Sequence, residues 1–211
     1  MTLKWLPNAI TIARCILALV VGYTIILLDR ELRSDAADMP LLFLPFVLFS
    51  IVALTDWVDG KLARSLNAES ALGARLDPIA DKLLSAASLL ALAYAERWGW
   101  MITVPAIAII CRDVLITAMR EAMGNPGTMK VSNSAKMKTA LVLTGIALVL
   151  LGMAVSELAG GAETYSPAWL ASRGVLLLGL GMVWVAAFLA VVTAWEYVSG
   201  LTGKSKDSSH Q

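Results

Sequence analysis

Several long apolar segments constrain this chain more than any other feature of its sequence. Of its 211 residues, 58% are hydrophobic and only 16% are charged. Soluble domains contain roughly 45–50% apolar residues, and a helix of about 20 apolar residues crosses the hydrocarbon core of a bilayer. The sequence therefore predicts an integral membrane protein.

The apolar segments predict an all-α fold, a polytopic membrane protein of six transmembrane helices. The expected spans cover roughly residues 9–28, 41–58, 71–95, 101–122, 137–156 and 172–196. We expect one membrane domain, 1–203, which opens with a short interfacial segment, 1–8. A polar tail, 204–211, follows it, and we expect disorder from Gly203 onward. No role is predicted for the loops 29–40 and 156–172.

Two pairs of aspartates stand at the facing ends of the second and third predicted helices. Asp56 and Asp59 are three residues apart, and Asp77 and Asp81 are four apart. Residues at these spacings share one face of a helix. The same faces carry small residues and one cation, namely Gly60, Ala63, Arg64 and Gly73. Neighbouring helices would therefore place four carboxylates in one polar cleft.

Four carboxylates that lie together near a low-dielectric core repel one another, and this repulsion would force protonation. Bound divalent cations relieve it, and an all-oxygen ligand set selects hard ions such as Mg²⁺ or Mn²⁺. Because magnesium commonly bridges to substrate phosphates, the cleft suits a pyrophosphate substrate. The alternative is that the aspartates are helix-end charges in ordinary ion pairs, but carboxylates inside a membrane are usually functional.

The cysteines and the single histidine exclude several kinds of site. Cys15 and Cys111 lie in apolar segments and are typical of small core residues. Neither a disulfide framework nor a zinc site is therefore indicated. His210 lies in the polar tail, so the catalytic base of any reaction must be another type of residue.

Most lysines and arginines outside the predicted spans fall on the side of the two termini and the aspartates. The opposite side has few, namely Arg30, Arg33, Arg97 and Arg173. By the positive-inside rule, the termini and the cleft face the cytoplasm. The expected location is the cytoplasmic, or inner, membrane of a bacterium, with the lipid bilayer as a partner and no nucleic acid.

A second set of charges occupies the fourth and fifth predicted helices and the loop between them. Its basic and hydroxyl side chains are Arg112, Arg120, Lys130, Ser132, Lys136 and Lys138. Asp113 and Glu121 are expected ion-pair partners, which leaves cations to face an anion. Such a cluster beside a metal cleft is typical of a phosphate site. Attraction to anionic lipid headgroups is an equal alternative for Lys130.

The aspartate segment resembles a known family. The pattern Asp56-x-x-Asp59-Gly60-x-x-Ala63-Arg64, then eight residues, then Gly73-x-x-x-Asp77-x-x-x-Asp81 is similar to the complete motif of the CDP-alcohol phosphatidyltransferases. The resemblance implies transfer of a phosphatidyl group from CDP-diacylglycerol to an alcohol, with release of CMP. It covers roughly residues 5–145 and also implies a homodimer.

The resemblance assigns roles to the four aspartates. Asp56, Asp59 and Asp77 would hold one Mg²⁺ or Mn²⁺ ion, and Asp56, Asp77 and Asp81 a second. Two such ions clamp a pyrophosphate and offset charge on the leaving group. Asp81 would also be the general base that accepts a proton from the attacking hydroxyl.

Further residues would bind CDP-diacylglycerol. On the first helix, the run Pro-Asn-x-x-Thr-x-x-Arg resembles that of family members, although Arg14 alone is also typical of an arginine that reaches the headgroups. The full expected set is Asn8, Thr11, Arg14, Gly60, Ala63, Arg64, Ser70 and Gly73.

The second charged region resembles the phosphatidylglycerophosphate synthases within this family. Those proteins commonly have Arg-Glu where this chain has Arg112-Asp113. The implied acceptor is glycerol 3-phosphate, and the side chains that would hold its phosphate are Arg112, Arg120, Ser132, Lys136 and Lys138.

Other functions remain open at the level of the sequence. A basic pocket favours a phosphorylated acceptor, so inositol phosphate is the main rival, followed by serine and phosphatidylglycerol. A divalent-cation transporter would also carry intramembrane carboxylates, but it needs polar residues through the midplane. An inactive scaffold is disfavoured because all four aspartates are present.

Overall fold

A computed structural model describes residues 6–34, 38–66, 73–122, 133–160 and 163–207 of the chain. These residues form six α-helices joined by short connections, and no strand occurs among them. The helices are α1 (Leu6–Arg33), α2 (Met39–Leu66), α3 (Gly73–Ala95), α4 (Trp100–Ala122), α5 (Asn133–Leu158) and α6 (Pro167–Asp207). The all-α prediction is confirmed.

Four of these helices contain stretches long and apolar enough to cross a membrane. The stretches are Thr11–Arg33, Trp100–Met119, Met137–Leu158 and Pro167–Tyr197. Among the residues whose side chains are described, α2 and α3 supply the shorter apolar stretches Met39–Thr55 and Lys82–Ala95. An apolar helix of at least 18 residues is a candidate membrane span, so the fold is that of an integral membrane protein.

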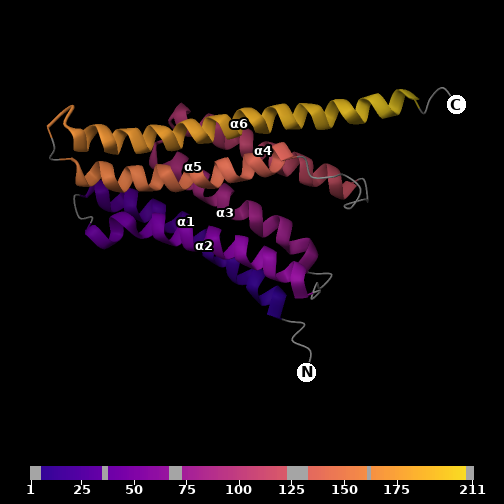
Figure 1. Ribbon diagram of the computed structural model, residues 1–211, viewed down its shortest axis with the longest axis horizontal. Helices are drawn as coiled ribbons and strands as arrows, with labels where there is room; N and C mark the ends of the chain where they lie inside the picture. Colours follow the sequence, from indigo (N-terminus) through magenta and orange to yellow (C-terminus); the bar gives the residue numbers. More distant parts are fainter. Residues whose placement is uncertain (1–5, 35–37, 67–72, 123–132, 161–162, 208–211) are drawn as a thin grey trace.

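The helices run side by side along the long axis of the molecule (Figure 1). Figure 1 shows α5 and α6 as a long pair on one side, with α1 and α2 on the other and α3 and α4 between or behind them. The start of α1, the end of α2, the start of α3, the end of α4, the start of α5 and the end of α6 all lie toward one end. The aspartate pairs and the second charged region are therefore carried to the same end of the bundle.

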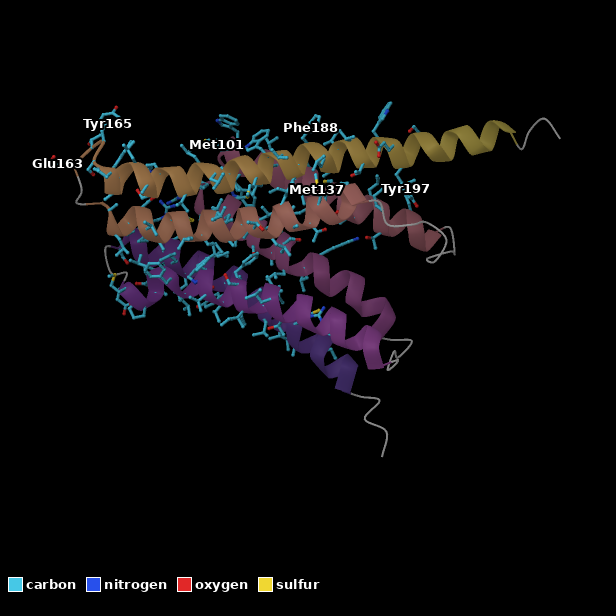
Figure 2. The ribbon with its side chains drawn as sticks, viewed as in Figure 1. Met101, Met137, Glu163, Tyr165, Phe188 and Tyr197 are labelled. Carbon is cyan, nitrogen blue, oxygen red and sulfur yellow. The ribbon has the colours of Figure 1, made fainter. Side chains whose placement is uncertain are left out.

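One apolar core joins all six helices. Each helix contributes at least one nearly inaccessible side chain, for example Ile25, Phe49, Leu92, Ile109, Ile146 and Val183. Large apolar side chains also cover the outside, and Figure 2 shows Phe188 on the outer side of α6. Extensive exposed apolar surface of this kind marks a membrane-facing protein.

Glycines allow α5 and α6 to pack with their backbones close together. A Cβ atom on Gly152 would lie 2.7 Å from the Cα of Leu176, and one on Gly179 would lie 2.6 Å from the backbone nitrogen of Val149. Small residues at helix contacts permit such close approach within membranes. The α5–α6 pair therefore depends on the absence of a side chain at these positions.

The expected bounds of α6 and of the tail are wrong. The helix begins at Pro167 rather than near residue 172, and it continues through residues 203–207, where disorder was expected. Each residue added to an existing helix contributes another backbone hydrogen bond. This gain explains why the helix continues beyond its apolar stretch.

The first part of the loop expected at 29–40 is also helical. Arg33, in the last turn of α1, forms an ion pair with Asp29 at 2.7 Å. Its guanidinium group also donates a hydrogen bond of 2.9 Å to the carbonyl oxygen of Ala95 at the end of α3. This arginine therefore joins the ends of two helices opposite the aspartate-bearing end of the bundle.

Candidate active site

The aspartates lie on two helices that meet through a short connection. Asp56 and Asp59 belong to α2, and Asp77 and Asp81 belong to α3. Six residues, 67–72, separate the end of α2 from the start of α3. The helical spacing predicted for each pair is therefore confirmed, while the four side chains lie outside the described part of the structure.

Most of the other predicted site residues also lie on helices whose side chains are not described at those positions. These residues are Asn8, Gly60, Ala63, Arg64, Gly73, Arg120 and Lys136. Ser70 and Ser132 lie outside the described residues altogether. On α1, Thr11 is buried and Arg14 is partly buried. The described part of the predicted site therefore consists mainly of Arg112 and Lys138, which were predicted to bind the acceptor phosphate; these two residues and the side chains bonded to them are called the acceptor region below.

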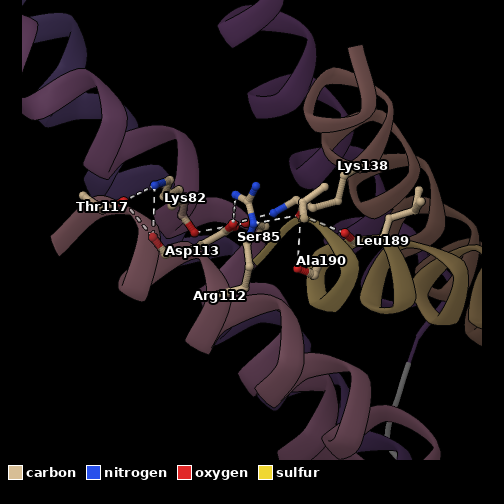
Figure 3. A network of polar contacts seen from close by, with 9 residues as sticks. Lys82, Ser85, Arg112, Asp113, Thr117, Lys138, Leu189 and Ala190 are labelled. Carbon is tan, nitrogen blue, oxygen red and sulfur yellow. Dashed lines mark hydrogen bonds and ion pairs between the residues drawn. The ribbon is translucent and has the colours of Figure 1, made fainter. Parts of the chain in front are cut away.

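The acceptor region centres on Asp113 of α4 (Figure 3). Its Oδ1 atom accepts a hydrogen bond of 3.1 Å from Arg112 and another from the ammonium group of Lys138 on α5. The Lys138 side chain is only 5% exposed and that of Asp113 14%. A buried ammonium group is stable only when it is paired, so the expected pairing role of Asp113 is confirmed.

Lys82 attaches α3 to the same place on α4. Its ammonium group donates a hydrogen bond of 3.2 Å to the carbonyl oxygen of Asp113 and another to the hydroxyl of Thr117. The Thr117 hydroxyl in turn donates to the Asp113 carbonyl at 2.7 Å. Since Lys82 directly follows Asp81, this contact joins the aspartate-bearing helix to the acceptor region.

The sixth helix completes the network. The Nε atom of Arg112 donates a hydrogen bond of 3.3 Å to the hydroxyl oxygen of Thr193. Thr193 is 8% exposed, and its own hydroxyl donates to the carbonyl of Leu189 at 2.8 Å. The network therefore spans α3, α4, α5 and α6, as Figure 3 shows.

The electrostatics of this network favour an anion. Arg112 and Lys138 share the single carboxylate of Asp113, so these three side chains together keep a net positive charge. In a region of low dielectric constant, a surplus charge acts more strongly than it does in water. Arginine and lysine side chains held in this way are suited to bind a phosphate group.

Only part of this network was predictable from the sequence. Arg112 and Lys138 were predicted site residues, and they meet at Asp113. Lys82, Thr117 and Thr193 were not predicted to have a role. The position of Lys82 directly after Asp81 was an available signal. Thr193 offered no such signal. It lies in an apolar run like those of the other helices, and only the structure shows that it faces α4.

The donor chemistry of the aspartates fits divalent metal ions. Among the residues whose side chains are described, no group of three or more His, Cys, Asp or Glu residues gathers. The carboxylates of Asp56, Asp59, Asp77 and Asp81 fall outside that set, and an all-carboxylate group is what Mg²⁺ and Mn²⁺ prefer. The fold and these charges define an integral membrane protein with a group of charged residues at one end of its bundle.

Comparison with known proteins identifies the family within this class of membrane proteins. Residues 4–195 match the family model described as CDP-alcohol phosphatidyltransferase, and the chain belongs to this family. The predicted family is thereby confirmed from residue 4 to residue 195, which includes most of α6.

Curated relatives match over most of their length. A protein of Cereibacter sphaeroides is 32% identical, with 92% of this chain and 95% of the relative aligned. One of Bacillus subtilis is 35% identical, with 92% and 93% aligned. One of Salmonella choleraesuis is 32% identical, with 80% and 86% aligned. All three are named CDP-diacylglycerol–glycerol-3-phosphate 3-phosphatidyltransferase.

Proposed function

We propose that this protein transfers a phosphatidyl group from CDP-diacylglycerol to glycerol 3-phosphate, with phosphatidylglycerophosphate and CMP as products. The observation that carries the choice of acceptor is the pairing of Arg112 and Lys138 on one carboxylate, that of Asp113. It leaves positive charge for an acceptor that bears a phosphate. The names of the relatives support the same reaction.

Asp56, Asp59, Asp77 and Asp81 would hold two divalent ions. When bound, Mg²⁺ or Mn²⁺ would stabilise negative charge on the pyrophosphate and on the departing CMP. In the proposed reaction, the acceptor hydroxyl oxygen bonds to the phosphorus that carries diacylglycerol, and the bond from that phosphorus to CMP breaks. Asp81 accepts the hydroxyl proton.

The polar start of α1 and the facing ends of α2 and α3 would bind the nucleotide. The glycines Gly60 and Gly73 would permit close approach of a ligand to the helix backbones. The cationic groups of Arg14 and Arg64 would face the phosphates. The diacyl chains would remain in the bilayer between helices, so the lipid substrate would not have to leave the membrane.

The arrangement in the membrane follows from the same proposal. All six helices would span the bilayer, with both termini and the active site on the cytoplasmic side. Most lysines and arginines outside the helices' apolar stretches lie at that end. We also propose a homodimer, which the exposed apolar faces of the described helices permit.

The reaction is tested by measuring CMP release from purified protein in detergent micelles that contain CDP-diacylglycerol and Mg²⁺ or Mn²⁺. Glycerol 3-phosphate, inositol phosphate, serine and phosphatidylglycerol are supplied separately. We expect release with glycerol 3-phosphate, because its phosphate matches the positive charge around Arg112 and Lys138. An Asp81→Asn variant should lose this activity, since it removes both a metal ligand and the base.

Two results would contradict the proposal. Release with a different acceptor alone would keep the family chemistry and overturn the choice of glycerol 3-phosphate. Release by folded Asp81→Asn at the wild-type rate would overturn the role of the aspartate cleft. Folding of each variant is checked by its elution as a single species in size-exclusion chromatography.

A further inference from the structure

Lys82, which directly follows Asp81 on α3, bonds to the neighbouring helix α4. Its ammonium group binds two groups of α4 that are one helical turn apart, the Asp113 carbonyl and the Thr117 hydroxyl. These groups are linked to each other by the 2.7 Å hydrogen bond from Thr117. Lys82 therefore contacts one defined turn of the neighbouring helix through two hydrogen bonds, whose acceptors are linked by a third.

That turn also carries Arg112 and contacts Lys138 of α5, the two cations proposed to bind the acceptor phosphate. The backbone of Asp113 accepts from Lys82, while its carboxylate accepts from Arg112 and Lys138. A displacement of α3 relative to α4 would therefore disturb both sets of bonds at residue 113. Hydrogen bonds from an ionised donor are shorter and stronger than neutral ones, so this connection resists such a displacement.

We propose that Lys82 is a positioning residue for phosphatidyl transfer, an inference that rests on the proposed function. Through the Asp113 turn, it fixes the distance between Asp81, its neighbour on α3, and the cations that bind the acceptor phosphate. The attacking hydroxyl and that phosphate belong to one small molecule. The spacing between the two helices consequently sets how well the hydroxyl is aligned.

Alignment of this kind affects the chemical step more than substrate binding. A displacement of about 1 Å can lower the rate roughly 100-fold. Loss of the Lys82 contact should therefore lower kcat with glycerol 3-phosphate. The Michaelis constant for CDP-diacylglycerol should change little, because the side chains proposed to bind that substrate, at residues 8–14 and 60–73, do not belong to the turn of α4 that Lys82 contacts.

The experiment compares Lys82→Met, Lys82→Arg and Thr117→Val in the CMP-release assay. We expect kcat to fall roughly 30-fold to 100-fold in Lys82→Met, and by less in Thr117→Val, where the Asp113 carbonyl can still accept from the lysine. Lys82→Arg should recover part of the loss, because its guanidinium can reach the same acceptors. The KM for CDP-diacylglycerol should stay within about twofold of wild type.

Thr103→Val is the matched control for Thr117→Val. Thr103 lies on the same helix, and its buried hydroxyl oxygen has no hydrogen-bond partner among the described residues. This variant should therefore keep wild-type kcat. If Lys82→Met does not fold, the proposal is tested with Thr117→Val instead. That variant removes one hydrogen-bond acceptor of Lys82 and keeps the lysine itself.

The double variant Lys82→Met/Thr117→Val separates coupling from general damage. Residues in direct contact have non-additive effects, so the double variant should be no slower than Lys82→Met alone. Additive losses, wild-type kcat in folded Lys82→Met, or an equal loss in Thr103→Val would each overturn the proposal. Absence of activity in the wild-type protein would instead remove the proposed function, and the positioning role with it.

Discussion

Replacing Gly179 with alanine is expected to separate α5 from α6 and to lower the stability of the folded protein by about 1–3 kcal/mol. A Cβ atom at this position would lie 2.6 Å from the backbone nitrogen of Val149 and 2.9 Å from the carbonyl oxygen of Gly145. Both neighbours are backbone atoms, which cannot move aside as a flexible side chain can. The loss is measured by heating purified protein in detergent and following the fraction that still elutes as folded protein.

Gly181→Ala provides the matched control, because it lies only two residues away on the same helix. No atom lies within 4 Å of a Cβ placed there. Alanine is favoured over glycine in a helix by about 0.4–1 kcal/mol, so this variant should be as stable as wild type or slightly more stable. Equal melting temperatures for Gly179→Ala and Gly181→Ala would contradict the close packing of α5 against α6.

The contrast between these two glycines shows what the sequence could not predict about the fold. The apolar runs were long enough to predict six helices and their order. Gly179 and Gly181 nevertheless have the same local surroundings, with leucine or methionine beside them. Only the tertiary arrangement determines that Gly179 faces α5 and Gly181 faces outward.

The helix ends were predicted less well for a related reason. Charged residues at the ends of apolar runs were interpreted as loops, whereas Asp29 and Arg33 form an ion pair within the last turns of α1. A helix can continue beyond its apolar stretch when backbone hydrogen bonds and such pairs stabilise the added turns. The extension of α6 through residues 203–207 is a second example.

The candidate site was predictable where its chemistry depends on spacing along one helix. The aspartate pairs required only the helical repeat, and Arg112 and Lys138 were selected as basic residues near that cleft. The roles of Lys82 and Thr193 depend on which faces of α3 and α6 meet α4. Such contacts between helices have no signature in a single sequence.

Replacing Asp113 with asparagine is expected to have the largest effect on stability among single changes in this network. The variant would leave the ammonium group of Lys138, whose side chain is 5% exposed, without its carboxylate. Removal of one partner from a buried ion pair typically costs about 3–5 kcal/mol. We expect a lower melting temperature in detergent and, in any folded fraction, weaker use of glycerol 3-phosphate.

Asp29→Asn is the control for this change, because it breaks an ion pair whose arginine is 43% exposed. Solvent reaches the arginine of this pair, so its loss should cost less than loss of the buried pair, about 1 kcal/mol or less. A melting temperature for Asp113→Asn no lower than that of Asp29→Asn would contradict the buried pairing.

The double variant Asp113→Asn/Lys138→Met distinguishes an unpaired charge from a loss of shape. Methionine has nearly the length of lysine but no charge, so the double variant contains no unpaired ammonium group at this site. Replacement of a buried pair by apolar side chains is often neutral for stability. The double variant should therefore melt above Asp113→Asn while its activity with glycerol 3-phosphate stays low. Recovery of stability without recovery of activity would show that the charges serve the substrate. Failure to recover stability would mean that Asp113 stabilises the fold chiefly through its pair with Arg112.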